Sequence, residues 1–118
     1  HIQDAKVLVM GATFKEDVSD IRNSKVIDVV NELKSFQVHV DLVDPHASSA
    51  EMEHEYGVGL SDKAGNGYDA IIVAVNHKEY KDMSELEFKS LLKNEQGVFV
   101  DVKGIFKGKI KDLEYWSL

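Results

Sequence analysis

Apolar runs alternate with amphipathic stretches along the whole chain. The runs at residues 6–10 and 70–75 are continuous and rich in β-branched side chains, which is typical of central parallel strands covered on both faces. Further strand patterns occur at residues 38–43, 58–60, 98–102 and 113–118. The first of these alternates between polar and apolar residues and is placed nearer an edge, and the last is expected to be an edge strand. The pattern predicts a sheet of five or six strands.

Helical periodicity fills the intervals between these strands. In residues 24–36 apolar side chains recur at helical spacing, and Asn23 or Ser24 is expected to cap the helix. Two more helix starts have capping-box spacing, at Ser48 with Glu51 and at Ser84 with Glu87. Strands and helices therefore alternate, which implies right-handed crossovers between parallel strands.

This alternation predicts an α/β fold, a Rossmann-like three-layer sandwich in which helices cover both faces of a mostly parallel sheet. With residues 58–60 as the third strand and 70–75 as the fourth, we expect the sheet order 3-2-1-4-5. Residues 1–118 are expected to form a single domain, because no linker, repeat or low-complexity tract divides them. Ligands of such sheets bind at the carboxyl ends of the strands where the strand order reverses. Here that point lies between the strands at 6–10 and 70–75.

The connection that leaves the first strand at this point is long and polar. Residues 11–23 comprise thirteen positions, whereas connections in α/β units usually take about 2–6 residues. Lys15 and Arg22 lie in this connection, and Lys103 follows the strand at 98–102 at the same edge of the sheet. Beside the unpaired N–H groups of a helix N-terminus, these cations favour a bound anion, particularly a phosphate.

A less specific interpretation of the same residues stays open. In it, Arg22 forms an ion pair with Asp20 or Asp17, and Lys15 is only solvated. If the anion site exists, Asp20 is expected to act by orienting Arg22. Asp44 ends the strand at 38–43, where a ribose-binding acid would lie, but Asp44-Pro45 is also a common start of a turn.

Composition and missing motifs narrow the function classes. The net charge of −7 argues against a nucleic-acid or anionic-membrane surface, and the absence of cysteine excludes disulfides and a cysteine nucleophile. No apolar run approaches the roughly 20 residues that span a bilayer, and no secretory signal is present, so a cytoplasmic location is expected. No GxGxxG fingerprint follows the first strand. The five histidines lack close ligand spacing, so we expect no metal site, and His77 is interpreted as a hydrogen-bonded loop histidine.

The segment GATFKEDVSDIRNS at residues 11–24 resembles the signature that opens the C-terminal, UDP-binding domain of the UDP-glucose/GDP-mannose dehydrogenase family. VDLVDP at 40–45, the strand at 69–75 and DVKG at 101–104 resemble later parts of that domain, in the same order. The F-K and D-x-R-x-S elements are most similar to the branch that acts on UDP-N-acetylhexosamines for capsule or surface polysaccharides.

The resemblance implies that the chain is the UDP-binding part of a longer NAD-dependent enzyme, which oxidises C6 of a UDP-sugar from alcohol to carboxylate. The implied substrate-binding residues are Thr13, Phe14, Lys15, Asp20, Arg22 and Lys103, although many members have Arg near the position of Lys103. A cysteine thiolate does the chemistry in this family, so no catalytic residue is expected in this chain. NAD is expected on an N-terminal domain of the same protein, beside a central domain that supports a homo-oligomer. The alternatives are a stand-alone Rossmann-like regulatory module and a structural oligomerisation domain.

Overall fold

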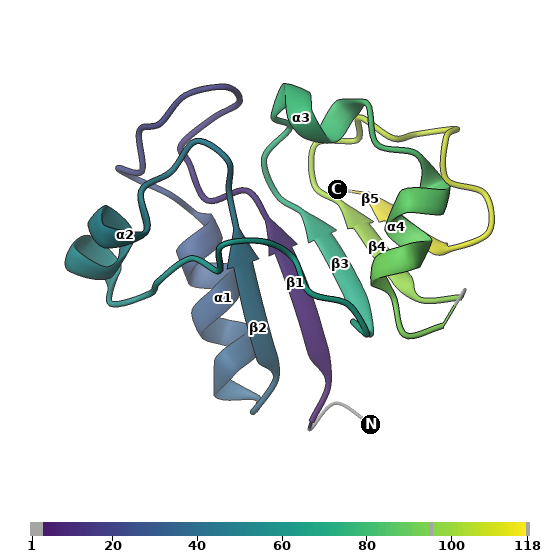
Figure 1. Cartoon of the computed structure of the whole chain (residues 1–118), viewed down its shortest axis with the longest axis horizontal. Helices are drawn as coiled ribbons and strands as arrows, with labels where there is room; N and C mark the ends of the chain where they lie inside the picture. The colour runs from purple at the N-terminus through teal and green to yellow at the C-terminus, as the bar shows by residue number, and fades with distance from the viewer. Residues whose placement is uncertain (1–3, 95, 118) are drawn as a thin grey trace.

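The computed structural model describes residues 4–94 and 96–117. Its strands are β1 (Lys6–Met10), β2 (His39–Val43), β3 (Ala70–Val73), β4 (Val98–Asp101) and β5 (Glu114–Ser117). Its helices are α1 (Val26–Ser35), α2 (Ser49–Tyr56), α3 (Lys78–Lys81) and α4 (Glu85–Leu91). All four strand pairings are parallel, and the sheet order is β2-β1-β3-β4-β5 (Figure 1). The predicted reversal of strand order between β1 and β3 is confirmed.

One predicted strand is wrong and one is confirmed. Residues 58–60 are not a strand, although the N–H of Ser61 donates a hydrogen bond to the carbonyl of Leu42 in β2. A single bond at the end of a turn does not make a ladder. The sheet therefore ends at β2, and the fifth strand comes from the C-terminal segment, where β5 pairs with β4 as the predicted edge strand.

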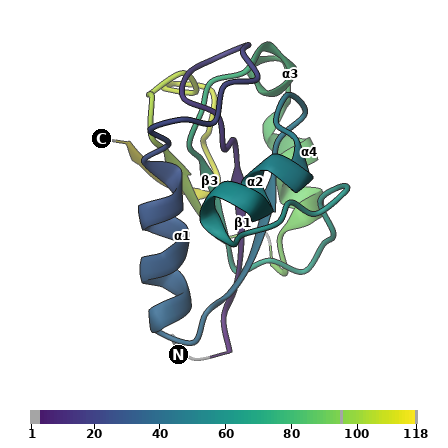
Figure 2. The same cartoon turned by 90° about the vertical axis from the view of Figure 1, so that its left-hand side faces the viewer.

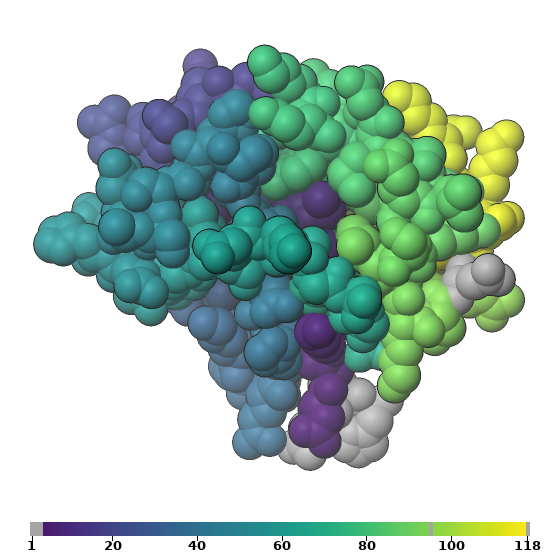
Figure 3. Space-filling model, viewed as in Figure 1, coloured from purple at the N-terminus to yellow at the C-terminus, as the bar shows by residue number. Residues whose placement is uncertain are grey.

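Helices lie on both faces of the sheet, which completes the predicted three layers. Figure 2 shows α1 on one side of the strands and α4 on the other. Side chains from β1 alternate between the two faces: Val7 and Val9 pack with the α1 cluster, and Leu8 and Met10 with the α4 cluster. In the face seen in Figure 3, α3, α4 and the segment after α2 cover most of the sheet. Within the described residues, no helix is both long enough and apolar enough to cross a membrane.

Two of the three predicted helix caps are present in the structure, and the third is not. Ser84 and Glu87 form the predicted capping box at α4, and Ser48 caps α2 by accepting a hydrogen bond from the N–H of Glu51. The expected cap of α1 by Asn23 or Ser24 is wrong. Lys25 is the N-cap residue and makes no side-chain cap, and Asn23 has a φ of 58°. The N–H groups that begin α1 are therefore not satisfied by a capping side chain.

On the α1 face, the helix covers only part of the sheet. Ile72, Val100 and Trp116 lie side by side in register across β3, β4 and β5, and each is at least partly exposed. Trp116 is 58% exposed, whereas its neighbour Tyr115 stacks on Phe99 on the other face. The uncovered apolar row continues toward the carboxyl ends of the strands, where the candidate site lies.

Candidate functional site

Gly11 brings the ends of β1 and β3 together at the point where the strand order reverses. Its φ is 106°, and a Cβ added there would lie 2.6 Å from Cβ of Val75 and 2.8 Å from the Val75 backbone nitrogen. Only glycine permits both this backbone conformation and this approach. The long loop of residues 11–23 starts from this contact and crosses the carboxyl edge of the sheet.

The carboxylate of Asp44 fixes the start of the loop. Its side chain is fully buried at the end of β2. Its donors are the backbone N–H groups of Ala12, Thr13, His46 and Ala47 and the ring Nε2 of His77. These bonds occupy the lone-pair sites of both oxygens, so none is left for a ribose hydroxyl. Burial alone would raise the pKa of Asp44, but the bonds from Ala12, His77 and His46 outweigh it and hold the pKa below its usual value.

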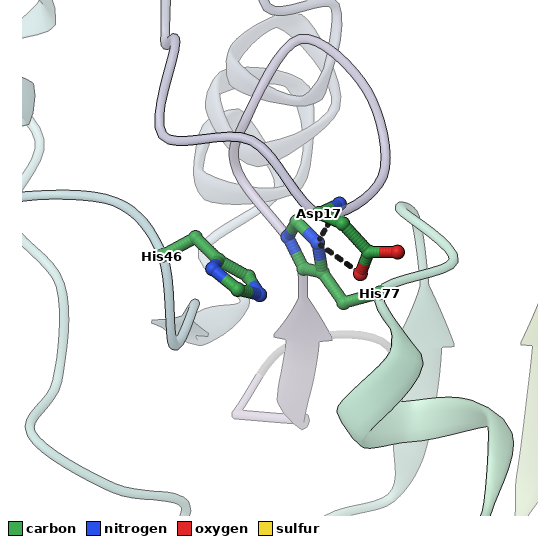
Figure 4. Close-up of side chains that lie close together, drawn as sticks. All are labelled: Asp17, His46 and His77. Carbon is green, nitrogen blue, oxygen red and sulfur yellow. Dashed lines mark hydrogen bonds and ion pairs between the residues drawn. The ribbon is translucent and has the colours of Figure 1, made fainter.

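His77 joins this carboxylate to the middle of the loop. Its ring is fully buried, with Nε2 at 2.9 Å from Asp44 Oδ2. Its Nδ1 lies 2.8 Å from the backbone nitrogen of Asp17 (Figure 4). The expectation of a hydrogen-bonded loop histidine is confirmed. Sequence spacing did not reveal that His46 and His77 meet, with ring centroids 4.5 Å apart. They are far apart in sequence, and the turns after β2 and β3 bring them together.

Asp17, His46 and His77 each offer one potential metal ligand atom, and these atoms lie within 4.8 Å of one another. The hydrogen bonds argue against a metal in this arrangement. Both ring nitrogens of His77 are engaged, and Nε2 of His46 lies 2.9 Å from Oε1 of Glu79. A bound cation would have to displace a backbone donor and an ion pair, so we interpret the cluster as a structural network.

A groove of about 470 Å³ opens beside the loop, between α1 and the exposed strands. Ile72 and Val100 belong to its apolar sheet wall, and Val26 and Val29 of α1 line it on the helix side. Its polar rim consists of Thr13, Asn23, Lys25 and Lys103, with Phe14 beside them. The groove therefore combines an apolar wall with two lysines and the start of α1, whose N–H groups have no side-chain cap.

Asp101 places Lys103 at this rim. The buried carboxylate of Asp101 accepts hydrogen bonds from the N–H groups of Ile105 and Phe106 and from the hydroxyl of Tyr115. These bonds fix the tight turn that follows β4 and carries Lys103. The Lys103 side chain is exposed, as a group that meets a soluble anion must be.

Arg22 and Asp20 form the ion pair that the less specific interpretation predicts. Two guanidinium nitrogens lie 2.9 and 3.0 Å from the two Asp20 carboxylate oxygens. The hydrogen bonds from Arg22 lower the pKa of Asp20 to about 2. Arg22 remains 81% exposed at its side chain, and a shallow hollow beside the groove is lined by Phe14, Asp20, Arg22 and Asn23.

The structure thus gathers most of the six predicted residues around Phe14. Thr13, Phe14 and Lys103 line the groove, and Phe14, Asp20 and Arg22 line the adjoining hollow. Lys15 is exposed and lines neither, and its ammonium has no hydrogen bond or ion pair within residues 4–94 and 96–117. The Thr13 hydroxyl is buried and donates to the carbonyl of Lys15.

Sequence reasoning missed the groove wall and the network behind the loop. Asn23 and Lys25 line the groove. The sequence pattern indicated Asn23 only as a helix cap and within the family signature, and it did not indicate Lys25. Asp17, Asp44 and His77 hold the loop through buried contacts between three separate connections. The spacing of these three residues along the chain does not predict those contacts.

Comparisons with known proteins show which family the chain is similar to. Residues 8–108 match the model of the UDP-glucose/GDP-mannose dehydrogenase family, UDP binding domain. The chain is 41% identical to UDP-N-acetyl-D-glucosamine 6-dehydrogenase of Pseudomonas aeruginosa over 96% of its own length and 27% of that protein. The Salmonella typhi protein of the same name is 37% identical over 96% of this chain and 27% of its own length.

A solved structure shares the fold. NDP-N-acetyl-D-galactosaminuronic acid dehydrogenase from Methanosarcina mazei superposes with a TM-score of 0.83 at 22% identity, over 98% of this chain and 25% of that one. The chain therefore spans about a quarter of the length of these relatives. The match over residues 8–108 places the chain in the UDP-glucose/GDP-mannose dehydrogenase family, as its UDP-binding domain.

Proposed function

We propose that the chain binds the uridine diphosphate part of a UDP-sugar in the groove between α1 and β4. The observation that carries this proposal is the position of Phe14 and Lys103 on one groove rim, beside the uncapped start of α1. A uracil ring needs an apolar or aromatic surface, which Phe14 offers at 55% exposure. A diphosphate needs cations and N–H donors, which Lys103, Lys25 and the helix start supply at the groove. Lys15 does not line the groove, but it follows Phe14 directly in the loop and its exposed ammonium is proposed to reach the phosphates.

The chemistry is proposed to lie outside this chain, in a longer NAD-dependent UDP-sugar 6-dehydrogenase. The residues present do not fit NAD. The loop after β1 has no glycine-rich turn, and the carboxylate of Asp44 is saturated by protein donors. The chain also has no cysteine to form a thiohemiacetal. By holding the nucleotide far from C6, this domain positions the sugar for groups elsewhere in the enzyme.

The proposed substrate is a UDP-N-acetylhexosamine, used to make a uronic acid for surface polysaccharide. The names of the two 6-dehydrogenase relatives support this sugar class. Reading the coding sequence on the N-terminal side of this segment tests the enzyme assignment directly. A GxGxxG unit and a cysteine-bearing domain there are expected, and an unrelated or absent region would refute it.

Titration of the 118-residue chain with UDP, followed by amide chemical shifts, tests the binding role. We expect shifts in residues 13–26 and around Lys103. Lys15→Ala should weaken binding by about 1.5–3 kcal/mol, the scale of a hydrogen bond to a charged group, which is roughly ten- to a hundredfold in Kd. Lys34→Ala, at the far end of α1, is the matched control and should leave the Kd unchanged.

Two outcomes would overturn the binding role. One is the absence of shifts at millimolar UDP, and the other is a set of shifts confined to the opposite edge of the sheet. The exposed Asp20–Arg22 pair also suits an oligomer contact, the structural alternative. Arg22→Ala would favour that alternative if it changed the mass of the assembled protein without changing the response to UDP.

A further inference from the structure

We propose that His77 is a positioning residue for the UDP site, and that its neutral ring holds the loop which presents Phe14 and Lys15. This inference rests on the proposed function, since it concerns the same site. His77 itself is fully buried and lines neither the groove nor the adjoining hollow. It acts on the ligand only through the loop.

The partners of His77 determine its tautomer. The backbone N–H of Asp17 can only donate, so Nδ1, at 2.8 Å, must carry the lone pair. The ionised carboxylate of Asp44 can only accept, so Nε2, at 2.9 Å, must carry the proton. Thr13 fits the same assignment: its hydroxyl donates to the carbonyl of Lys15 and turns a lone pair toward Nε2 at 3.2 Å. One neutral ring therefore satisfies three fixed groups.

These contacts fasten the loop on both sides of the exposed residues Phe14 and Lys15. Thr13 is held on the N-terminal side by Asp44 and His77. Asp17 is held on the C-terminal side, because its N–H bonds to His77 and its Oδ1 accepts the N–H of Lys78 at 2.7 Å. Phe14 and Lys15 lie between the two anchors and project into solvent. Asp17 has a φ of 58°, a conformation that a free loop would rarely keep without such contacts.

The groups packed around the ring come from three separate connections, and the Asp17 N–H is the one that requires an acceptor at Nδ1. A proton on Nδ1 would face the N–H of Asp17 and break that bond, although Asp17 Oδ1 lies 3.9 Å away. The His46 ring packs on the other side at 4.5 Å and is itself paired with Glu79. The Tyr80 ring of α3 closes the pocket at 5.6 Å. The ring is thus suited to a fixed hydrogen-bonding role.

Three substitutions of His77 test its hydrogen bonds to Asp17 and to Asp44 separately. His77→Asn keeps an acceptor at the δ position, for Asp17, and His77→Gln keeps a donor at the ε position, for Asp44. His77→Leu removes both. His54→Asn, on the exposed face of α2, is the matched control. For each variant we would measure the Kd for UDP, the thermal midpoint and the hydrogen-exchange rate of the Asp17 amide.

We expect His77→Leu to remain folded, to exchange the Asp17 amide faster, and to bind UDP about tenfold more weakly, the scale of one lost hydrogen bond. His77→Asn should recover part of the exchange protection and of the affinity, which a merely stabilising residue would not predict. A folded His77→Leu variant with the affinity of the native chain would overturn the inference. A variant with a lower thermal midpoint but unchanged UDP affinity would overturn it equally.

A measurement on the unaltered chain keeps the inference testable even if His77→Leu does not fold. The ¹⁵N shifts of the ring should show a protonated Nε2 and an unprotonated Nδ1, and the reverse pattern would refute the anchoring of Asp17. If the unaltered chain shows no response to UDP, the proposed function fails. The anchoring of the loop is then still judged by the tautomer and by Asp17 exchange.

Discussion

At the scale of single residues, the carboxylate of Asp44 connects the ends of β1, β2 and β3. It accepts bonds from Ala12 and Thr13 after β1, from its own turn after β2, and from His77 after β3. A buried carboxylate without such donors would have a raised pKa, whereas here the pKa is lowered. Ionised Asp44 therefore stabilises the folded state, and this contribution depends on pH.

Asp44→Asn should lower the free energy of unfolding at pH 7 by roughly 1–3 kcal/mol, because its amide presents a donor to N–H groups that need an acceptor. Since the folded pKa lies below the ordinary value of 3.8, the ionic contribution is complete above that value and is lost as the pH falls through the folded pKa. Urea unfolding from pH 7 to pH 3 should show the difference between native chain and variant shrinking below about pH 4.

The exposed Asp62→Asn provides the control for this series. It should change the free energy of unfolding by no more than about 0.5 kcal/mol at pH 7. A pH-independent difference for Asp44→Asn would mean that the carboxylate contributes only its shape. That result would also weaken the tautomer assigned to His77, which depends on an ionised partner.

At the scale of elements, the contact between the ends of β1 and β3 depends on Gly11. Gly11→Ala forces a side chain into a φ of 106° and into contact with Val75. The backbone conformation alone costs about 1–3 kcal/mol, and the overlap with Val75, which follows the end of β3, adds to this. Because the loop of residues 11–23 starts here, we also expect the affinity for UDP to fall. Chemical denaturation and UDP titration of the same variant measure both effects.

Gly57→Ala is the control that separates the backbone strain of a positive φ from the steric overlap of the added Cβ with Val75. Gly57 also has a positive φ, 71°, but nothing lies within 4 Å of its added Cβ. It should cost about 1–2 kcal/mol, the penalty for a left-handed residue, and leave UDP binding unchanged. If Gly11→Ala costs no more than Gly57→Ala, then β1 and β3 can separate freely and the close approach does not shape the site.

Comparing the predicted with the observed strands and helices shows which of them the sequence could predict. Continuous β-branched runs identified β1 and β3, and the Ser84 capping box identified α4, because both signals are local. The strand expected at 58–60 failed because pairing depends on a neighbour that the segment meets only at Ser61. The prediction that Asn23 or Ser24 caps α1 failed because the long loop runs directly into the helix: Asn23 has a φ of 58°, and Lys25 takes the N-cap position.

The residues of the candidate site likewise fall into those that the sequence could predict and those that it could not. Phe14, Asp20, Arg22 and Lys103 could be placed at one sheet edge, since the carboxyl ends of parallel strands meet there. The Asp20–Arg22 pair was also foreseeable, being two residues apart. The contact of His77 with Asp17 spans 60 residues and exists only once the loop has folded against the end of β3. Local hydrophobic periodicity and residue spacing cannot predict a contact over that sequence separation.

At the scale of the whole molecule, the two faces of the sheet differ in how they are covered. Phe88 and Phe106 pack edge-on against Phe99 of β4, and Phe99 is fully buried. On the other face, Val100 and Trp116 remain partly exposed beyond the edge of α1. Parallel sheets are usually covered on both faces. The groove exists because this face is left open, so incomplete coverage and the proposed binding site have the same structural origin.

This asymmetry predicts that replacing an aromatic residue lowers the free energy of unfolding strongly on β4 and very little on β5. Phe99→Ala should lower the free energy of unfolding by about 3–5 kcal/mol, as for a buried aromatic core residue. Trp116→Thr, which places a β-branched residue with high strand propensity in β5, should change it by about 0.5 kcal/mol or less. Trp116 is the single tryptophan of the chain, so its fluorescence reports this face alone. Its emission in the folded chain should already resemble that of a solvated indole, and a strongly blue-shifted emission that depends on protein concentration would show instead that two copies cover the open face.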